Sequence, residues 1–358
     1  MADVVWSASV STTATGTYTT LGNLQNVSMV LGRNGVADQW RPSTCTLTGR
    51  LPGSLPSITI NDFLKVTYTG LSGDYCFRIS DVIITYDPVS AADTWTVTAE
   101  GNLAPIGRSV SNSATLSALQ TFDAIRTLVT SSNVFIESPA GSGKSLVSAI
   151  TLTNENPMQT MQELMTTEQG YLVDYDFPNW VKLYARGSQT AAATVTFTDD
   201  NTASTTYKAA YNEITFASLA ENYVTGVVVN PVGLAQQTSG TETRSREFTT
   251  YDFTTTQAAQ LASYIKVLLG QSSLVPASLT SNVKMWTGTN FLGLLYLGSQ
   301  ITIKLRGTTY NCVIEGLTIN GNPEQTVVQV RLSPATAYGF LTLDDAVLGR
   351  LDNNSLGF

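Results

Sequence analysis

The chain of 358 residues is acidic and sparsely charged: 19 lysines and arginines stand against 27 aspartates and glutamates, giving a net charge of −8. It has no histidine, which excludes Ser-His and Cys-His catalysis, histidine-containing metal sites and the commonest general base at neutral pH. The acidic balance disfavours tight binding of nucleic-acid phosphates, because such binding needs a basic patch.

The start of the chain, residues 1–4, has neither a basic segment nor an apolar one, so we expect no signal peptide. No apolar run of 18 residues exists, so we expect no transmembrane helix. The cysteines, Cys45, Cys76 and Cys312, are too scattered for a zinc cluster. Each lies in an apolar strand pattern, which predicts buried free thiols.

Short alternating runs separated by turn residues predict that the first hundred residues form a sandwich or barrel of strands. These runs are 45–48, 64–68, 75–79, 82–86 and 95–99. Apolar residues at helical spacing then predict a helix over 115–130. A second helix is expected from Pro157, with Asn156 as its cap, a buried methionine stripe and Gly170 at its end.

Strands resume after the second helix and continue through the middle of the chain. They are expected at 171–175, 180–184, 193–198, 213–216 and 224–229. The polar, glycine-containing stretch 236–246 predicts a flexible loop. A third helix is expected over 255–269, closed by Gly270.

The segment SPAGSGKS, residues 138–145, ends like a phosphate-binding loop. Ser138 stands where that motif needs its first glycine, and 146–153 alternates like a strand where the motif needs a helix. A long hairpin loop between two strands, with an exposed Lys144, is therefore the favoured interpretation. A nucleotide hydrolase is the least favoured function.

An internal repeat is the most informative pattern. The order of strands and glycine turns over 64–99 recurs over 301–332, with tyrosine and cysteine near the start of the second strand in both copies. Residues 75–79 correspond to 310–314 in this alignment. The pattern predicts a duplication in which each unit needs a neighbour to cover its sheet edges.

Three stretches resemble the tail hub, or baseplate hub, proteins of long-tailed bacteriophages, which are also called minor tail proteins. They are 27–51, with its R-N-G turn and T-C-T-L-T strand; 77–108, with D-T-W-T-V-T-A; and 332–358, with L-T-L-D-D-A-V-L-G-R-L-D. The second stretch departs slightly from the family pattern, since Glu100-Gly101-Asn102 stands where an aspartate is common.

The resemblance implies a fold that is mainly β with a few helices, in which two tube-like β-sandwich or barrel domains flank an α+β middle region. The expected division is 1–108 for the first tube-like domain, 109–221 for the middle region and 222–334 for the second tube-like domain, with helix 255–269. An extended C-terminal arm over 335–358 completes it. Two arrangements of this arm are open: it packs on a neighbouring subunit or tip protein, or it folds back onto its own domain.

The resemblance also implies a structural role in the virion, at the phage tail tip, as a homotrimeric, pseudo-hexameric hub ring. Such a ring joins the tail tube to the baseplate and forms part of the channel for genome ejection. The implied partners are further copies of the chain, the distal tail or tail tube protein, the tape measure protein, and tail tip, fibre or spike proteins. DNA would pass through without specific binding, which suits an acidic chain.

A carbohydrate-binding or cell-wall-degrading tail protein is the alternative. Trp40, Trp95, Trp180 and Trp286 have the chemistry to stack on sugars, although tryptophans within strands more often lie in the core. The pairs Asp199-Asp200 and Asp344-Asp345 do not form a two-carboxylate active site unaided, because adjacent residues on an extended chain point in opposite directions. We expect a protein that is not an enzyme, and we assign no catalytic, cofactor-binding or metal-binding residue.

Overall fold

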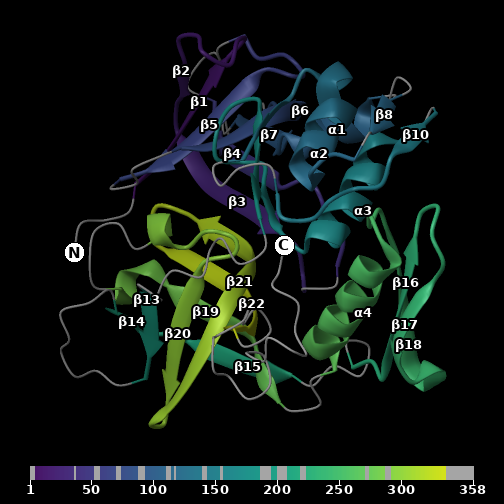
Figure 1. The fold of residues 1–358 in the computed structure, drawn as a ribbon. Helices are drawn as coiled ribbons and strands as arrows, with labels where there is room; N and C mark the ends of the chain where they lie inside the picture. The colour runs from purple at the N-terminus through teal and green to yellow at the C-terminus, as the bar shows by residue number, and fades with distance from the viewer. Residues whose placement is uncertain are drawn as a thin grey trace.

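A computed structural model describes residues 5–35, 38–51, 57–69, 74–87, 93–109, 114–116, 118–138, 143–153, 156–185, 195–199, 208–217, 223–270, 274–286 and 292–335. Strands predominate over helices, so the expected mainly β, α+β class is confirmed. Most strands belong to one large sheet that takes strands from both the beginning and the end of the chain (Figure 1).

The large sheet draws on two separate stretches of sequence. The first contributes β1 (Trp6–Ser11), β2 (Thr19–Leu21), β3 (Leu24–Gly32), β4 (Thr44–Arg50), β5 (Phe63–Tyr68), β6 (Tyr75–Thr85) and β7 (Thr94–Glu100). The second contributes β13 (Val195–Thr198), β14 (Lys208–Ala209), β15 (Glu213–Ala217), β19 (Val275–Asn282), β20 (Gln300–Leu305), β21 (Thr308–Gly321) and β22 (Thr326–Pro334).

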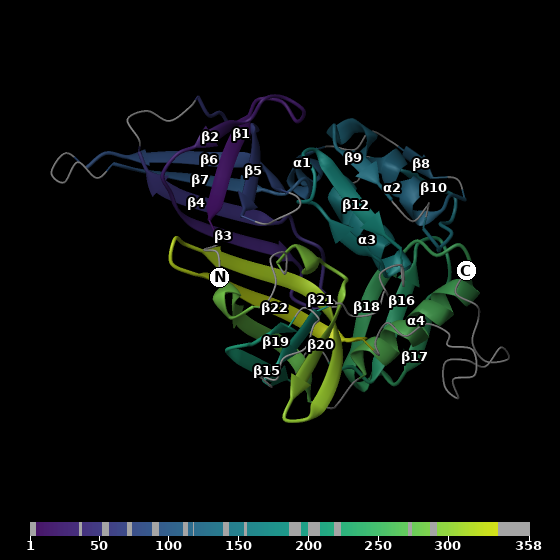
Figure 2. The same cartoon turned by 90° about the vertical axis from the view of Figure 1, so that its left-hand side faces the viewer.

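The remaining elements form small sheets and helices. They are α1 (Leu103–Arg108), β8 (Ala114–Leu116), α2 (Thr121–Val129), β9 (Phe135–Glu137), β10 (Ile150–Leu152), α3 (Pro157–Glu168), β11 (Tyr171–Val173), β12 (Trp180–Tyr184), β16 (Gly226–Pro231), β17 (Gln237–Gly240), β18 (Ser245–Thr250) and α4 (Thr255–Leu269). Short 3₁₀ turns occur at Thr130–Ser132, Glu242–Arg244, Val283–Met285 and Leu292–Leu294. Figure 2 shows the helices and small sheets gathered on one side of the large sheet.

The second and third predicted helices are confirmed, although α3 ends at Glu168 and the left-handed residue that follows is Gln169, not the expected Gly170. The Asn156 side chain accepts a hydrogen bond of 3.0 Å from the backbone N–H of Met158, and Pro157 occupies the first turn, as helix caps require. Met161 and Met165 are buried, so the methionine stripe is part of the core. Helix α4 spans 255–269 and ends at Gly270, as predicted.

Two local predictions are wrong. The helix expected over 115–130 begins only at Thr121, because Ala114–Leu116 pairs with Ile150–Leu152 as a small sheet. The stretch expected to be a loop at 236–246 contains strand β17 and the start of β18, which pair on either side of β16. In both places partner strands far away in the sequence outweigh the local preference.

The hairpin expected around residues 134–153 is also wrong. Strand β9 pairs in parallel with β12, whereas β10 pairs with β8, so the two segments belong to different sheets. The expected runs 75–79 and 82–86 form one continuous strand, β6, and the corresponding runs near the C-terminus form β21.

Sheet membership divides the chain at residues other than the boundaries expected from the sequence. Strands β13, β14 and β15 fall within the expected middle region but lie in the large sheet. Strands β16, β17 and β18 fall after residue 222 but form their own sheet, against which α4 packs. The expected C-terminal arm lies outside the described residues from 336 onward.

Candidate functional site

The large sheet contains the same four-stranded unit twice. Unit 1 consists of β6, β7, β4 and β3 in that order, and unit 2 consists of β21, β22, β19 and β15. Their pairings correspond except toward the end of β15, where a bulge between Thr215 and Phe216 interrupts the pairing with β19 while β3 pairs regularly with β4 at the equivalent residues. Val82 opposes Val97, which opposes Leu47, which opposes Val27; Leu317 opposes Val330, which opposes Leu279, which opposes Ile214.

A β-bulge occurs at the same point of both units. Ser80 is the extra residue between Ile79 and Asp81 of β6, and Glu315 is the extra residue between Ile314 and Gly316 of β21. Ile79 and Ile314 occupy equivalent positions in the predicted repeat. The register that the two units share at these positions and the bulge that they share support the duplication, since bulges tend to persist as designed features of a sheet. The sequence repeat covered only part of this unit, and missed the correspondence of β3 and β4 with β15 and β19.

Units 1 and 2 are joined through β3 and β21, which pair in antiparallel fashion from Gly316 opposite Gly32 to Gly321 opposite Val27. The Ser28 hydroxyl donates a hydrogen bond of 2.8 Å to the Asn320 side-chain oxygen across this joint. We call this pairing the internal joint. It places strand β21 beside β3, the edge strand of unit 1.

The two units form a row of eight strands with β6 at one end and β15 at the other. These two outer edges are equivalent to the two edges that pair in the internal joint, and among the described residues they are unpaired. The second half of β6, which is equivalent to the joint-forming half of β21, pairs with β7 on one side only. Strand β15, equivalent to β3, pairs with β19 on one side only. The β6 edge exposes Ile83 and Ile84, which are 52% and 40% accessible.

One face of the eight strands is buried and the other is open and rich in hydroxyl and amide side chains. The open face carries Asn26, Ser28, Thr44, Thr46, Thr48, Thr85, Thr94, Thr96, Thr98, Thr215, Ser278, Thr280, Thr318, Asn320 and Gln329. The charged residues that the described strands place on it are Arg50, Arg78, Arg331, Asp81, Glu100 and Glu213, three positive and three negative. The face therefore has no cationic excess with which to hold a polyanion.

The internal joint is fastened by a buried ion pair. Glu315, the extra residue of the bulge, is fully buried and accepts a hydrogen bond of 2.9 Å from Arg33 Nε. The same carboxylate accepts hydrogen bonds from the hydroxyls of Tyr171, at 3.1 Å, and Ser333, at 2.5 Å. The Arg33 guanidinium also lies over the Trp40 ring, 4.6 Å from its centroid. Unit 1, unit 2 and strand β11 therefore meet at one carboxylate.

A second buried polar cluster attaches the β11–β12 turn to unit 1. The Asp174 carboxylate accepts hydrogen bonds from the backbone N–H and the hydroxyl of Ser43, at 3.0 and 2.6 Å. Burial raises the pKa of this carboxyl above its ordinary value, against the opposite effect of the Ser43 hydrogen bonds. The Asn102 side chain donates to the backbone oxygens of Asp174, Phe177 and Trp180.

The loop that ends like a phosphate-binding loop holds an anion of the protein itself. The backbone N–H groups of Lys144 and Ser145 donate to the Glu168 carboxylate at 2.9–3.0 Å, and Glu168 is fully buried. Gly143 has φ of +96°, a conformation that favours glycine. The loop thus uses the geometry of an anion nest to bind a carboxylate at the end of α3, while the Lys144 side chain is exposed.

The other residues singled out in the sequence do not converge on one site. Trp40, Trp95 and Trp286 are buried, whereas Trp180 is 40% accessible and packs against Phe135. The three cysteines are free and buried, as predicted. The Asp199 carboxylate accepts a hydrogen bond from the backbone N–H of Arg306, while Asp200, Asp344 and Asp345 lie outside the described residues.

Among the described residues, no three histidine, cysteine, aspartate or glutamate side chains are placed to hold a metal ion. No described helix is both long and apolar enough to cross a membrane.

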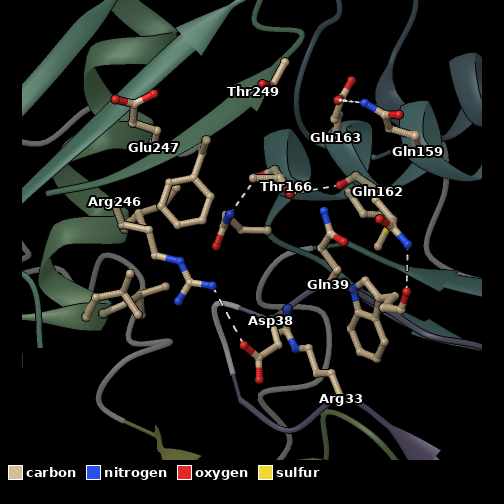
Figure 3. A pocket seen from close by; sticks show the side chains of 17 residues that line it. Arg33, Asp38, Gln39, Gln159, Gln162, Glu163, Thr166, Arg246, Glu247 and Thr249 are labelled. Carbon is tan, nitrogen blue, oxygen red and sulfur yellow. Dashed lines mark hydrogen bonds and ion pairs between the residues drawn. The ribbon is translucent and has the colours of Figure 1, made fainter. Parts of the chain in front are cut away.

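Two adjoining hollows lie near the internal joint. One, of about 390 Å³, separates the segment at Asp38–Trp40 from α3 and β18, and Figure 3 shows Arg246 pointing toward Asp38 across it. Their ion pair is 3.8 Å long. The other hollow, of about 450 Å³, lies beside the ends of β3 and β4.

The comparisons with known proteins concern structure alone. No protein-family model matches the chain, and no curated protein matches its sequence. A tail protein from Neisseria meningitidis matches 94% of this chain and 98% of its own length, with a TM-score of 0.66 and 10% identity. The 43 kDa tail protein of prophage MuSo2 from Shewanella oneidensis matches 93% and 99%, with a TM-score of 0.61 and 12% identity.

An Escherichia coli component of the type VI secretion system is also similar. It is described as structurally similar to the phage T4 tail proteins gp27 and gp5, and it matches 89% of this chain and 75% of its own length, with a TM-score of 0.55 and 10% identity. The expected likeness is therefore confirmed at the level of the fold: this chain has the fold of phage and prophage tail proteins.

Proposed function

We propose that this chain is a structural component of a phage tail tip: a trimeric hub ring, pseudo-hexameric through its duplication, that joins the tail tube to the baseplate. The single observation that carries the proposal is the internal joint together with the two unpaired edges equivalent to it. The tail-protein fold supports the location in the virion.

The ring follows from repeating the internal joint between chains. If β6 of one copy pairs with β15 of the next as β21 pairs with β3, every four-stranded unit has two neighbours and no edge stays open. A head-to-tail contact of this kind produces a closed ring when the rotation that relates one copy to the next divides a full turn into equal parts. Three copies supply six units, which matches a tube of sixfold symmetry.

The open face of the units would line the channel of such a ring. Its threonine, serine and asparagine side chains hydrate well, and the charges that the described strands place on it cancel, with three arginines and three acids. DNA phosphates would find no cationic excess there, so DNA would pass without being held. The distal tail or tail tube protein, the tape measure protein and tip or spike proteins are the proposed neighbours.

A carbohydrate-binding or lytic role is the second candidate. The observation that favours it is the exposed pair Phe135 and Trp180, with ring centroids 5.8 Å apart on the surface of the small β9–β12 sheet. Exposed aromatics of this kind suit a sugar face. The ring accounts for more of the molecule, since it explains the duplicated register, both edges and the open face.

The mass of the protein in solution, measured by light scattering over a concentration series and combined with negative-stain imaging, tests the ring. Within the chain, Asn320 of β21 lies opposite Ser28 of β3. Thr85 of β6 is equivalent to Asn320 and Thr215 of β15 is equivalent to Ser28, so the proposed joint places Thr85 opposite Thr215 of the next copy. We expect wild type to form trimers. The T85K/T215K double variant should not assemble, because like charges directly opposite each other destabilise strand pairs.

The T85K/T215E variant restores opposite charges at the same place and should assemble again. Thr96→Lys is the matched control, because Thr96 lies on the same face but on the inner strand β7. A monomeric wild type, or a T85K/T215K variant that assembles as well as wild type, contradicts the proposed joint. Binding of a monomer to cell-wall glycans would then favour the second candidate.

A further inference from the structure

The larger hollow has an unusual lining for so acidic a chain. It has a volume of about 450 Å³ and lies beside the end of β3 and the start of β4. Its charged residues are Arg33, Asp38, Arg41, Arg246 and Arg331. Among the described residues, four arginines thus share this wall with one carboxylate, in a chain whose net charge is −8. We call this cavity the arginine hollow.

Two glycines at the end of the internal joint make room for the hollow. Gly32, which lines it, has φ of +79°, a conformation that favours glycine, and β3 ends there. The next backbone N–H, that of Arg33, donates to the backbone oxygen of Glu315 at 3.0 Å. Gly32 lies opposite Gly316, so neither strand places a side chain over the sheet at this register. Arg331, which lies opposite Gly316 on the other side, borders the space that this leaves.

Two of the four arginines have carboxylate partners. Arg33 pairs with Glu315, and Arg246 pairs with Asp38. Setting these two acids against the four arginines leaves a formal charge of +2. This excess belongs to the other two arginines of the wall.

Arg331, the first of these two, is held in place by neutral partners. Its guanidinium donates to the side-chain oxygens of Asn34 and Thr318, the latter at 3.0 Å. Its Nε is buried and has no hydrogen-bond partner among the described residues. Burial lowers the pKa of the Arg331 guanidinium, because desolvation penalises its charge. Arg331 is thus a positioned, half-buried cation, and no carboxylate of the described residues forms an ion pair with it.

Arg41, the second, is exposed on the segment before β4 and lines the same hollow. It too forms no ion pair within the described part of the chain. A guanidinium presents its N–H donors in a planar fork that matches two oxygens of a carboxylate or a phosphate. An oxyanion in the hollow would supply both guanidiniums with a counter-charge, and the attraction is strongest at Arg331, where burial reduces screening by water.

We propose that the arginine hollow is a binding site for an oxyanion, the carboxylate or phosphate group of a small ligand. Arg331 is its positioned donor and Arg41 its donor at the rim. The hollow has room for more than the anion alone, since one water molecule takes up only about 30 Å³. Its lining comes from one chain, so the site does not depend on formation of the ring.

Isothermal titration calorimetry of the full-length protein tests the proposal, with inorganic phosphate and succinate as the probes. Phosphate offers a tetrahedral oxyanion and succinate offers planar carboxylates, so the two titrations show which group the hollow prefers. Sodium chloride keeps the ionic strength equal in every titration, because screening weakens the attraction between charges. We expect the preferred anion to bind wild type at one site per chain.

Three variants locate the site. R41Q removes the charge at the rim without disturbing the core, because Arg41 is exposed. R331K keeps the charge on β22 but loses the planar fork. Each should weaken binding of the preferred anion at least about tenfold, since each loses a hydrogen bond between charged groups.

R50Q is the matched control, because it removes the same charge from another exposed arginine of the large sheet. Arg50 lies six residues along β4 from Thr44, which lines the hollow, and is therefore about 20 Å away. Its affinity for the anion should equal that of wild type. Should R331K fail to fold, the comparison of R41Q with R50Q decides the question.

Two outcomes overturn the proposal. If neither phosphate nor succinate binds wild type, the hollow is not an oxyanion site. If R41Q and R50Q lose affinity equally, or if neither R41Q nor R331K loses any, the anion is attracted by net charge or bound elsewhere. Selective loss in R41Q supports the site whichever anion is preferred.

Discussion

Arg33 and Glu315 form an ion pair of 2.9 Å although 282 residues separate them in the sequence. The carboxylate is the extra residue of the β21 bulge, and the guanidinium follows directly after β3. The pair therefore forms only when units 1 and 2 pair through the internal joint. Its partner Tyr171 adds the small β11–β12 sheet to the same contact.

Removing the Glu315 charge should destabilise the protein strongly. Glu315→Gln leaves Arg33 nearly buried without its counter-charge, and breaking a buried pair from one side costs about 3–5 kcal/mol in the free energy of unfolding. The double variant R33M/E315Q should cost less than the sum of R33M and E315Q, by about 0.5–3 kcal/mol. Urea unfolding of all four proteins measures this, and strict additivity contradicts the coupling.

The Glu168 carboxylate should stabilise the loop at Gly143–Ser145. Glu168→Ala leaves the backbone N–H groups of Lys144 and Ser145 without their acceptor, which costs about 1–3 kcal/mol for each group. Glu163→Ala makes the same change on the same helix, where the carboxylate accepts from the exposed Gln159 side chain, and should cost less than about 1 kcal/mol. Equal losses in thermal unfolding would show that helix propensity, not the loop, is responsible.

Asp174 should make stability fall with rising pH. Its pKa is raised in the folded state above the ordinary value of 3.8, so above pH 3.8 the unfolded chain releases this proton first. The stability that Asp174 contributes is thus largest at acidic pH and declines as pH rises through the window between the two pKa values. Subtracting the unfolding free energy of Asp174→Asn at each pH isolates this slope, and a difference that grows with pH contradicts it.

The three thiols should be unreactive in the folded protein. Burial raises the pKa of Cys76 and Cys312 to about 12 and that of Cys45 further, so the thiolate is scarce and inaccessible. At about pH 8 a thiol reagent should label none of them in buffer and all of them in concentrated denaturant. Rapid labelling of one cysteine without denaturant would show local opening of its strand.

Local patterns in the sequence determined the elements that depend on short-range signals. Asn156 and Pro157 start α3 because a side-chain oxygen and a ring without an N–H suit a helix N-terminus. The alternation in 64–68 and 301–305 predicted strands, and the repeat predicted the duplication, because both record which side chains face the core. The lack of histidine excluded Ser-His and Cys-His catalysis and histidine-containing metal sites.

The tertiary structure decided everything that depends on partners remote in the sequence. Residues 114–116 and 237–240 are strands because a partner strand satisfies their backbone groups, which no local pattern reveals. The correspondence of β15 with β3 is also invisible in the sequence, since it rests on register and not on residue type. Glu315 and Glu168 look like ordinary surface charges in the sequence, and only folding brings the donors that allow them to be buried.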